Sequence, residues 1–250
     1  MKELRNIALC AILLSAVLGL GAPAWAEAPG ASGPQGDTWA SIAKLPDWQG
    51  IWELDWRHGG GLAAARPAPP KLTPTAQAKL DAYRKAQQSG KDLAPEQANC
   101  LPPGMPGIMT QPYPIEFLYS PGKVAIAVEA YMQLRQVFTD GRGHPKDPDP
   151  LFNGHSIGHW EGDVLVVNTT GFLPGFLNTP VRNSDKLSVT EKFTLDTAKL
   201  ALTRTYSAED PVYLKGKYTG SDTVFVADAP FNPGKCQELN FIDYSKQQKP

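Results

Sequence analysis

From residue 115 onward, the chain is a series of short segments in which apolar and polar residues alternate, separated by turn residues. A period of two is typical of strands that bury one face. The connections Ser120-Pro121-Gly122 and Glu161-Gly162-Asp163 are short enough to close hairpins. The alternation predicts strands at 115–119, 124–129, 134–139, 155–160, 164–170, 187–194, 200–206, 212–219, 223–227 and 238–244.

Strands that follow one another without helices between them predict an antiparallel meander. About ten such strands in about 200 residues either close into a barrel or fold into a sandwich. We favour an up-and-down, lipocalin-like barrel, because consecutive hairpins place neighbours side by side and closure removes exposed edges. One surface helix is expected at about 74–88, where Thr73 is an N-cap and Pro74 takes the first helical position. The expected fold is therefore mainly β, with one domain over 46–250.

The N-terminus has the pattern of an export signal. Lys2 and Arg5 precede an apolar run at 7–20, and Ala24-Trp25-Ala26 fits a cleavage site. We expect cleavage after Ala26, a flexible leader rich in Ala, Gly and Pro over 27–45, and a periplasmic or secreted protein. No later stretch approaches the roughly 18 apolar residues of a membrane span, so no integral membrane segment is expected after cleavage.

Charge and cysteine content give two further expectations, one about partners and one about a disulfide. The chain has 24 Lys and Arg against 25 Asp and Glu, a net charge of −1, which argues against nucleic acid as a partner. Removal of the signal takes away Cys10 and leaves Cys100 and Cys236. In an oxidising compartment this pair predicts one disulfide, with two separate buried thiols as the alternative.

Several motifs resemble those of a large family of exported proteins from Gram-negative soil bacteria. The matching segments are 100–106 (CLPPGMP), 139–142 (TDGR) with His144 and Pro145, 154–158 (GHSIG) and 160–163 (WEGD). Segment 47–52 (DWQGIW) also resembles the Gly-x-Trp first strand of lipocalin-like barrels. The resemblance implies a periplasmic, β-rich single domain and no particular reaction. The chain departs from the family at His159, where Arg is usual, which argues against an obligatory catalytic or metal-binding role for that residue.

Three histidines, His144, His155 and His159, fall close together in the sequence. On a strand, His155 and His159 share a face but lie about 13 Å apart, which is too far for one metal ion. The glycines at 154 and 158 argue against the helix on which such a pair would bind zinc. We therefore expect neither a metal nor another cofactor.

A second set of residues suits acid–base chemistry. Asp140, Arg142 and His144 follow the 134–139 segment, and a carboxylate beside a histidine fixes its tautomer and raises its basicity. Within strands, Glu129 and Glu191 predict buried carboxylates whose pKa is raised by desolvation, or which pair with Arg135. The alternative is structural, because Asp, Gly, Arg and Pro form turns and buried Arg–Glu pairs often serve the fold alone.

The segment 102–114 carries prolines at 102, 103, 106, 112 and 114 together with Met105 and Met109, and it cannot form regular structure. Two interpretations compete: a lid whose thioethers contact an apolar ligand, or a plug that closes the barrel. We favour the plug.

Gly154 and Gly158 bracket His155 and predict that another group approaches this part of the strand closely. A ligand at the imidazole is one candidate. The other is Trp160 or Trp52 packing across the glycines.

Three functions remain open. The first is a cofactor-independent lyase, isomerase or hydrolase that acts on a small apolar or aromatic molecule in the barrel mouth. His155 or His144 would be the base and Arg142 or Arg135 the electrostatic partner, with Asp140 and Glu129 as further acid–base candidates. The second is a ligand carrier of the lipocalin type that breaks no bond, and the third is an envelope interaction protein that uses the proline-rich loop. Candidate ligand contacts are Trp48, Trp52, Trp56, Tyr131, Trp160, Met105 and Met109.

Overall fold

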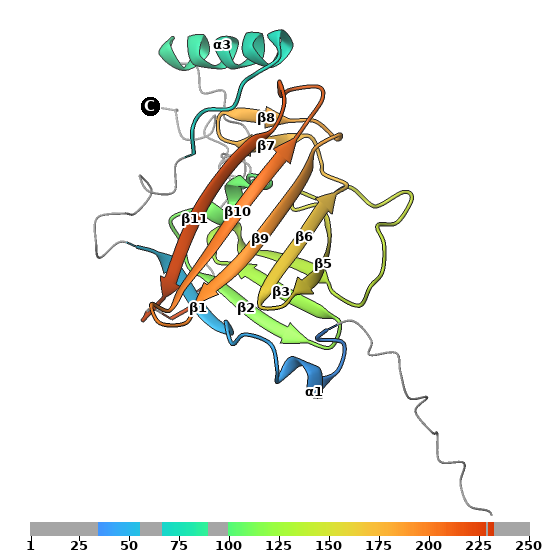
Figure 1. Cartoon of the computed structure of the whole chain (residues 1–250). Helices are drawn as coiled ribbons and strands as arrows, with labels where there is room; N and C mark the ends of the chain where they lie inside the picture. Colours follow the sequence, from blue (N-terminus) through green and yellow to red (C-terminus); the bar gives the residue numbers. More distant parts are fainter. Residues whose placement is uncertain (1–34, 56–66, 90–99, 229, 233–250) are drawn as a thin grey trace, which may run out of the picture. The chain divides into compact units, whose positions relative to one another are not determined.

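A closed β-barrel is the centre of the computed structural model, which describes residues 35–55, 67–89, 100–228 and 230–232 (Figure 1). Around the barrel the strands follow the order β1-β11-β10-β9-β6-β5-β4-β3-β2, and β1 pairs with both β11 and β2 to close it. The mainly β fold and the barrel predicted from the alternation are confirmed. The strands are β1 (Gly50–Leu54), β2 (Ile115–Ser120), β3 (Lys123–Val128), β4 (Gln133–Phe138), β5 (His155–Glu161), β6 (Val164–Thr170), β9 (Ser188–Asp196), β10 (Ala201–Glu209) and β11 (Tyr218–Val226).

The nine strands of the barrel include one parallel pair, β4 and β5. Directions that alternate around a ring return to their start only after an even number of steps, so a closed sheet of nine strands cannot be antiparallel throughout. The parallel pairing is short, with Val137 opposite Ser156 and Phe138 opposite Ile157. We call this junction the parallel seam, and residues 139–154, which return the chain from the end of β4 to the start of β5, the crossover. The predicted antiparallel meander holds for the other neighbouring pairs.

The predicted helix is present as α3 (Pro74–Gln88), capped by Thr73, whose hydroxyl accepts the Ala76 N–H. Only Ala76 and Leu80 of this helix are buried, as expected for a surface helix. The segments 212–219 and 223–227 are not two strands, because 211–214 turns and a single strand, β11, follows. The sequence did not predict five short elements: α1 (Trp39–Ile42), the two-stranded sheet of β7 (Gly175–Asn178) with β8 (Val181–Asn183), and the 3₁₀ turns η1 (Gly107–Thr110) and η2 (Ala130–Met132). The turn η1 lies in segment 102–114, which we expected to form no regular structure.

The described fold begins earlier than residue 46. Thr38 caps α1, and the Gly36 carbonyl accepts the Gly122 N–H over 2.8 Å, which ties residues 36–42 to the β2–β3 hairpin. The last part of the predicted leader is therefore ordered against the barrel. The signal segment, the rest of the leader, Trp56, Cys236 and the predicted strand 238–244 lie outside the described residues. Among the described helices, none combines the length and apolar character needed to cross a membrane.

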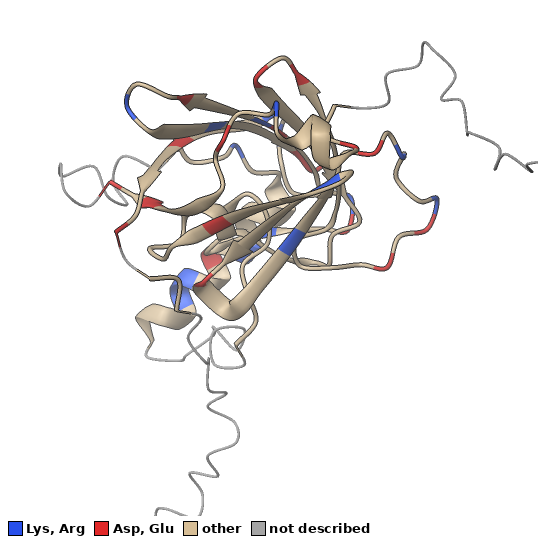
Figure 2. Cartoon of the chain, turned by 90° about the horizontal axis from the view of Figure 1, so that it is seen from below, with Lys and Arg blue, Asp and Glu red and all other residues tan. Residues whose placement is uncertain are grey.

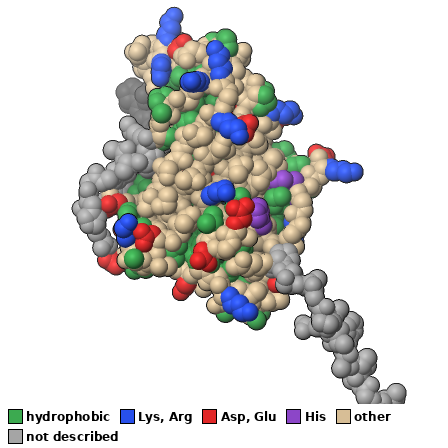
Figure 3. All heavy atoms as spheres, in the orientation of Figure 1, with side chains coloured by type: hydrophobic (Ala, Val, Ile, Leu, Met, Phe, Trp, Pro, Cys, Tyr) green, Lys and Arg blue, Asp and Glu red, His purple; other side chains and the backbone are tan. Residues whose placement is uncertain are grey.

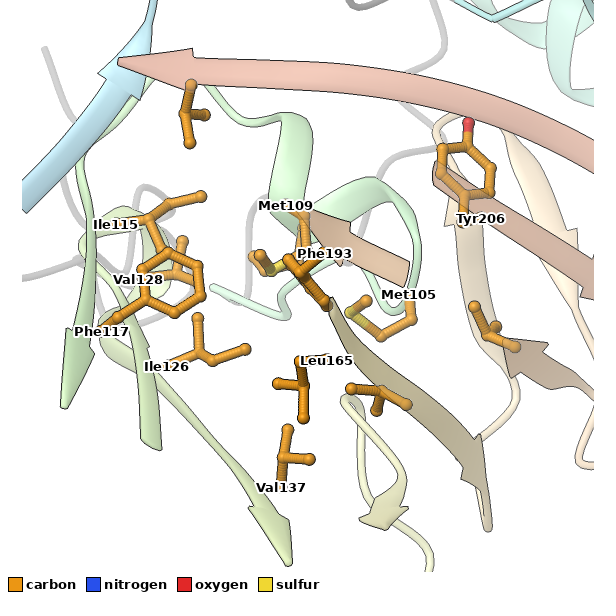
Figure 4. Close-up of a cluster of buried hydrophobic side chains, with 14 of the residues drawn as sticks. Met105, Met109, Ile115, Phe117, Ile126, Val128, Val137, Leu165, Phe193 and Tyr206 are labelled. Atoms are coloured by element: carbon orange, nitrogen blue, oxygen red, sulfur yellow. The ribbon is translucent and has the colours of Figure 1, made fainter. Parts of the chain in front are cut away.

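Side chains fill the barrel interior (Figure 4). Trp48 and Trp52 are buried, and the Trp48 ring packs edge-on against Trp160 with centroids 5.1 Å apart. Met105, just before the 3₁₀ turn η1 (Gly107–Thr110), and Met109, within it, lie in the same core and are 0% and 3% exposed. These five side chains, which we predicted to contact a ligand, form part of the core instead, and the proline-rich segment packs into the barrel as the plug interpretation predicts.

Charged residues are spread around the described barrel, with Lys and Arg interspersed among Asp and Glu (Figure 2). The two signs of charge are therefore mixed over the described barrel and give it no basic face in this view.

Candidate functional site

Because successive side chains of a strand point to opposite faces, the residues of the parallel seam form two groups, one inside the barrel and one on its outer face. Arg135 of β4 and Ser156 of β5 point into the barrel and are buried, whereas Phe138 and His155 lie on the outer face. On this side of the molecule histidine side chains reach the surface (Figure 3). His155 therefore does not face the barrel interior, where we expected the candidate base, and side chains of the core occupy that interior.

On the outer face, His144 of the crossover meets His155. The two Nδ1 atoms are 2.9 Å apart, and His144 Nε2 lies 2.8 Å from Asn168 Oδ1 on β6. Asn168 in turn donates through Nδ2 to the Thr190 hydroxyl over 3.2 Å. The sequence analysis named both histidines as candidate bases, and the structure brings them together.

Hydrogen bonding determines which nitrogen of each ring carries a proton. Because the oxygen of Asn168 faces His144 Nε2, that nitrogen must be protonated, and neutral His144 accepts at Nδ1. His155 must then donate its Nδ1 proton to His144. Neutral His155 is left with a lone pair on Nε2, which makes no hydrogen bond to the described part of the chain. The chain Asn168–His144–His155 therefore ends in a free basic nitrogen.

The surroundings of His155 keep its ring neutral. Partial burial, with the nearby His144 and Arg142, holds the pKa of His155 below its ordinary value. The imidazole stacks on Phe138, with centroids 5.4 Å apart and an interplanar angle of 24°. The Arg142 guanidinium lies 4.1 Å from the centre of the same phenyl ring. The ring is thus both oriented and available as a base at neutral pH.

Asp140 does not orient His144, which corrects the predicted carboxylate–histidine pair. Asp140 instead accepts from Arg142, whose Nε lies 2.9 Å from both carboxylate oxygens, and both side chains are substantially exposed. This hydrogen bond lowers the pKa of Asp140. Asn168 takes the orienting role instead, and its only signal in the sequence is an amide at an outward position of the strand next to His155.

A pocket of about 530 Å³ opens where the crossover runs past the first half of β4, which has no partner on β5. His155 and Phe138 line it. Leu134 and Leu151 also line it and are 57% and 53% exposed, an unusual state for large apolar side chains that stand together. We call this the seam pocket. Its remaining lining residues are Gln133, Arg135, Gln136, Pro145, Asp147, Pro148, Asp149, Phe152, Asn153 and Gly154.

Arg135 belongs to a buried ionic network inside the barrel. It donates to Ser156, to Thr169 and to Glu191, and Glu191 also accepts from Arg204 over 2.9 Å. Burial alone would raise the pKa of Glu191, but the two arginines outweigh it and hold the pKa below its ordinary value. The predicted pairing of Glu191 with Arg135 is confirmed. The raised pKa that we considered as the alternative does not occur.

Glu129 and Tyr131 lie away from the histidines. β3 ends at Val128, and Glu129 begins the turn η2, where its carboxylate accepts the Asn232 N–H over 2.9 Å. The prediction of a buried strand carboxylate at 129 is therefore wrong. Tyr131 lines a different pocket, of about 540 Å³, with prolines of the plug and of segment 67–70.

The glycines beside His155 are approached by the sheet itself. A Cβ on Gly154 would lie 2.6 Å from the Thr170 carbonyl oxygen and 3.0 Å from the Phe172 ring, and one on Gly158 would lie 2.8 Å from Val137. The predicted close approach is present, but the neighbouring groups are neither a ligand nor Trp160 or Trp52.

The chain matches no protein-family model, and comparisons with curated proteins and with solved structures give no significant match. Within the described ranges, no three His, Cys, Asp or Glu side chains converge as a metal site would require.

Proposed function

We propose that the seam pocket binds a small apolar or aromatic molecule and that His155 acts on it as a general base. The observation that carries this proposal is the chain of contacts from Asn168 through His144 to His155, which leaves Nε2 of His155 free beside an apolar pocket. These contacts fix the tautomer of His155 and leave its unbonded nitrogen available to a ligand, as general-base catalysis requires.

The proposed step is a proton transfer without a cofactor. His155 Nε2 takes a proton from an X–H or C–H group of the ligand, and the Nδ1 proton stays on the hydrogen bond to His144. Return of the proton to another atom of the ligand completes an isomerisation. In an elimination, the bond to a leaving group on the neighbouring carbon breaks as the double bond forms, and His155 passes the proton to the departing group. Since protonation before binding occupies Nε2, turnover is present above the lowered pKa of His155 and is lost as the pH falls through it.

A carrier without chemistry is the second candidate, and the exposure of Leu134 and Leu151 favours it. An apolar ligand would cover both side chains whether or not a bond is broken. Two substitutions at His155 distinguish the candidates. Gln keeps a hydrogen-bonding end but cannot exchange a proton at neutral pH, and Ala removes both.

We expect His155→Gln to retain the ligand and to lower product formation at least about 100-fold, and His155→Ala to lose retention as well. Each variant is incubated with a small-molecule periplasmic extract, and retained and released compounds are identified by mass spectrometry. His159→Ala is the matched control, because His159 is exposed and bonds only Glu161. Product with wild type alone supports the enzyme, and equal retention by wild type and the Gln variant without product supports the carrier. If both His155 variants unfold well below wild type and the control, His155 is a structural residue and the site is wrong.

We further propose that the protein is exported and that Cys100 pairs with Cys236, which lies outside the described residues. A chain-entropy argument gives such a long loop closure about 4–5 kcal/mol. Intact-mass measurement before and after reduction is expected to differ by two protons, with alkylation blocked until reduction. Alkylation of both thiols in freshly exported, unreduced protein would contradict the pairing.

A further inference from the structure

A second chain of hydrogen bonds ends at the seam pocket. Gln133 donates through Nε2 to the Tyr131 carbonyl over 3.0 Å, so its Oε1 faces Asn153. Asn153 donates through Nδ2 to that oxygen over 3.2 Å. The Oδ1 of Asn153 is then a buried acceptor without a partner in the described structure, and the residue as a whole is 6% exposed. A buried carbonyl oxygen is destabilising unless something donates to it.

Each of the two series of hydrogen bonds therefore ends in a hydrogen-bond acceptor that belongs to a residue of the seam pocket. Asn153 Oδ1 and His155 Nε2 are both acceptors, two residues apart, and both residues line the pocket. Two exposed carboxylates, Asp147 and Asp149, lie on its rim and add acceptors and negative charge. Lys146, which stands between Pro145 and Asp147 in the sequence, is not among the lining residues.

Arg135 is the one cation among the residues that line the pocket, and it does not offset the negative charge of Asp147 and Asp149. Arg135 is 2% exposed, and its guanidinium is held on the inner face by Ser156, Thr169 and the carboxylate of Glu191. Its Nη1 has no partner in the described structure and is as buried as Asn153 Oδ1, and its charge is neutralised by Glu191. The exposed lining also includes Gln136, whose amide can donate or accept, so the net charge exposed at the pocket comes from Asp147 and Asp149.

We infer that the seam pocket selects compact apolar or aromatic molecules that donate hydrogen bonds, with amines preferred over alcohols and carboxylates rejected. This rests on the proposed function and adds the class of ligand to it. An ammonium group offers three donors and a positive charge, which suits His155 Nε2 together with the rim carboxylates. An alcohol satisfies one acceptor without the charge, and a carboxylate meets the like charges of Asp147 and Asp149.

Benzylamine, benzyl alcohol and benzoate test this order, because they share a ring and differ in the polar group. Each is titrated into the folded full-length mature protein, and binding is followed through the imidazole signals of His155 in two-dimensional NMR. We expect benzylamine to bind about 5- to 10-fold more tightly than benzyl alcohol at low salt, and benzoate to leave His155 unmoved. The double substitution Asp147→Asn with Asp149→Asn is expected to reduce the preference for the amine to within about 2-fold. Asp163→Asn, in the β5–β6 turn and outside the pocket, is the control and should leave it unchanged.

The outcomes separate this inference from the proposed function. If all three probes shift His155 with similar affinity, or benzoate binds best, the donor preference is overturned while a ligand site at His155 stands. Failure of every probe to move His155 also overturns the inferred class. The proposed function is tested separately, by whether the periplasmic extract yields a compound whose retention depends on His155 while the His155 variants remain as stable as wild type.

Discussion

Replacing Glu191 with Leu is expected to lower the free energy of unfolding by about 3–5 kcal/mol, or to prevent folding altogether. Glu191 is fully buried and accepts from Arg135 and Arg204, so its loss leaves two arginines without a carboxylate between them. Arg204 would keep Asp222, which lies within 3.1 Å of its Nε, whereas Arg135 would keep only hydroxyl partners. An unpaired buried cation is among the most destabilising changes a core can suffer.

Glu161→Gln is the matched control, because Glu161 also contacts two basic groups, His159 and Lys192, but on the surface. Its removal should leave the stability nearly unchanged, because solvent screens both contacts. Both variants are compared by urea unfolding. A Glu191→Leu protein that unfolds at the same urea concentration as the control would show that the network contributes little to the fold.

The same network gives stability a pH dependence. The pKa of Glu191 is lower in the folded chain than in the unfolded one, so its contribution is present above the unfolded pKa and is lost as the pH falls through the folded pKa. Asp222 behaves in the opposite way, because burial raises its pKa despite Arg204.

Gly154→Ala is expected to cost about 2–4 kcal/mol, which lowers the Tm by roughly 4–16 °C for a chain of this size. Gly154 has a φ of +63°, and an added Cβ would lie 2.6 Å from a backbone oxygen that cannot move without disturbing the β5–β6 ladder. The effect is expected to extend to the adjacent His155 and to weaken ligand retention.

Gly162→Ala separates the two causes. Gly162 has nearly the same φ, +61°, but an added Cβ there meets nothing within 4 Å. It should therefore lose only the conformational cost, about 1–2 kcal/mol. Thermal unfolding of both variants measures the difference. Equal Tm values would mean that the backbone near Gly154 shifts to admit the added Cβ without loss of stability.

The sequence predicted the closed barrel but not the parallel pair, β4 and β5, within it. Period-two alternation between 115 and 206 follows from burial of one strand face, and β2 to β6, β9 and β10 appear close to where it predicts them. Alternation carries no information on strand direction, however, so nothing in the sequence indicated the parallel pair. The turn at 211–214 was not predicted because Val212 and Leu214 alternate with Tyr213 as they would in a strand. In the structure, the Asp210 carboxylate stabilises this turn by accepting the Val212 and Tyr213 N–H groups.

The candidate site, too, was predicted only in part from the sequence. Residue types alone pointed to His144 and His155, because few side chains exchange protons near neutral pH. Their orienting partner could not be identified in this way, since Asn168 is distant in sequence and became a neighbour only through the β5–β6 register. The placement outside the barrel also escaped prediction, because it depends on how the core residues, including Met105 and Trp48, fill the interior.

The odd number of strands constrains how this architecture can diversify. Inserting or deleting a single strand would change the parity of the ring and would force the seam to disappear or a second one to form. Strands can therefore be gained or lost only in pairs if the seam is kept, whereas the crossover that lines the pocket can change in length and composition without altering any pairing register. A lineage built on this ring is thus free to vary what it recognises while its strand count stays fixed.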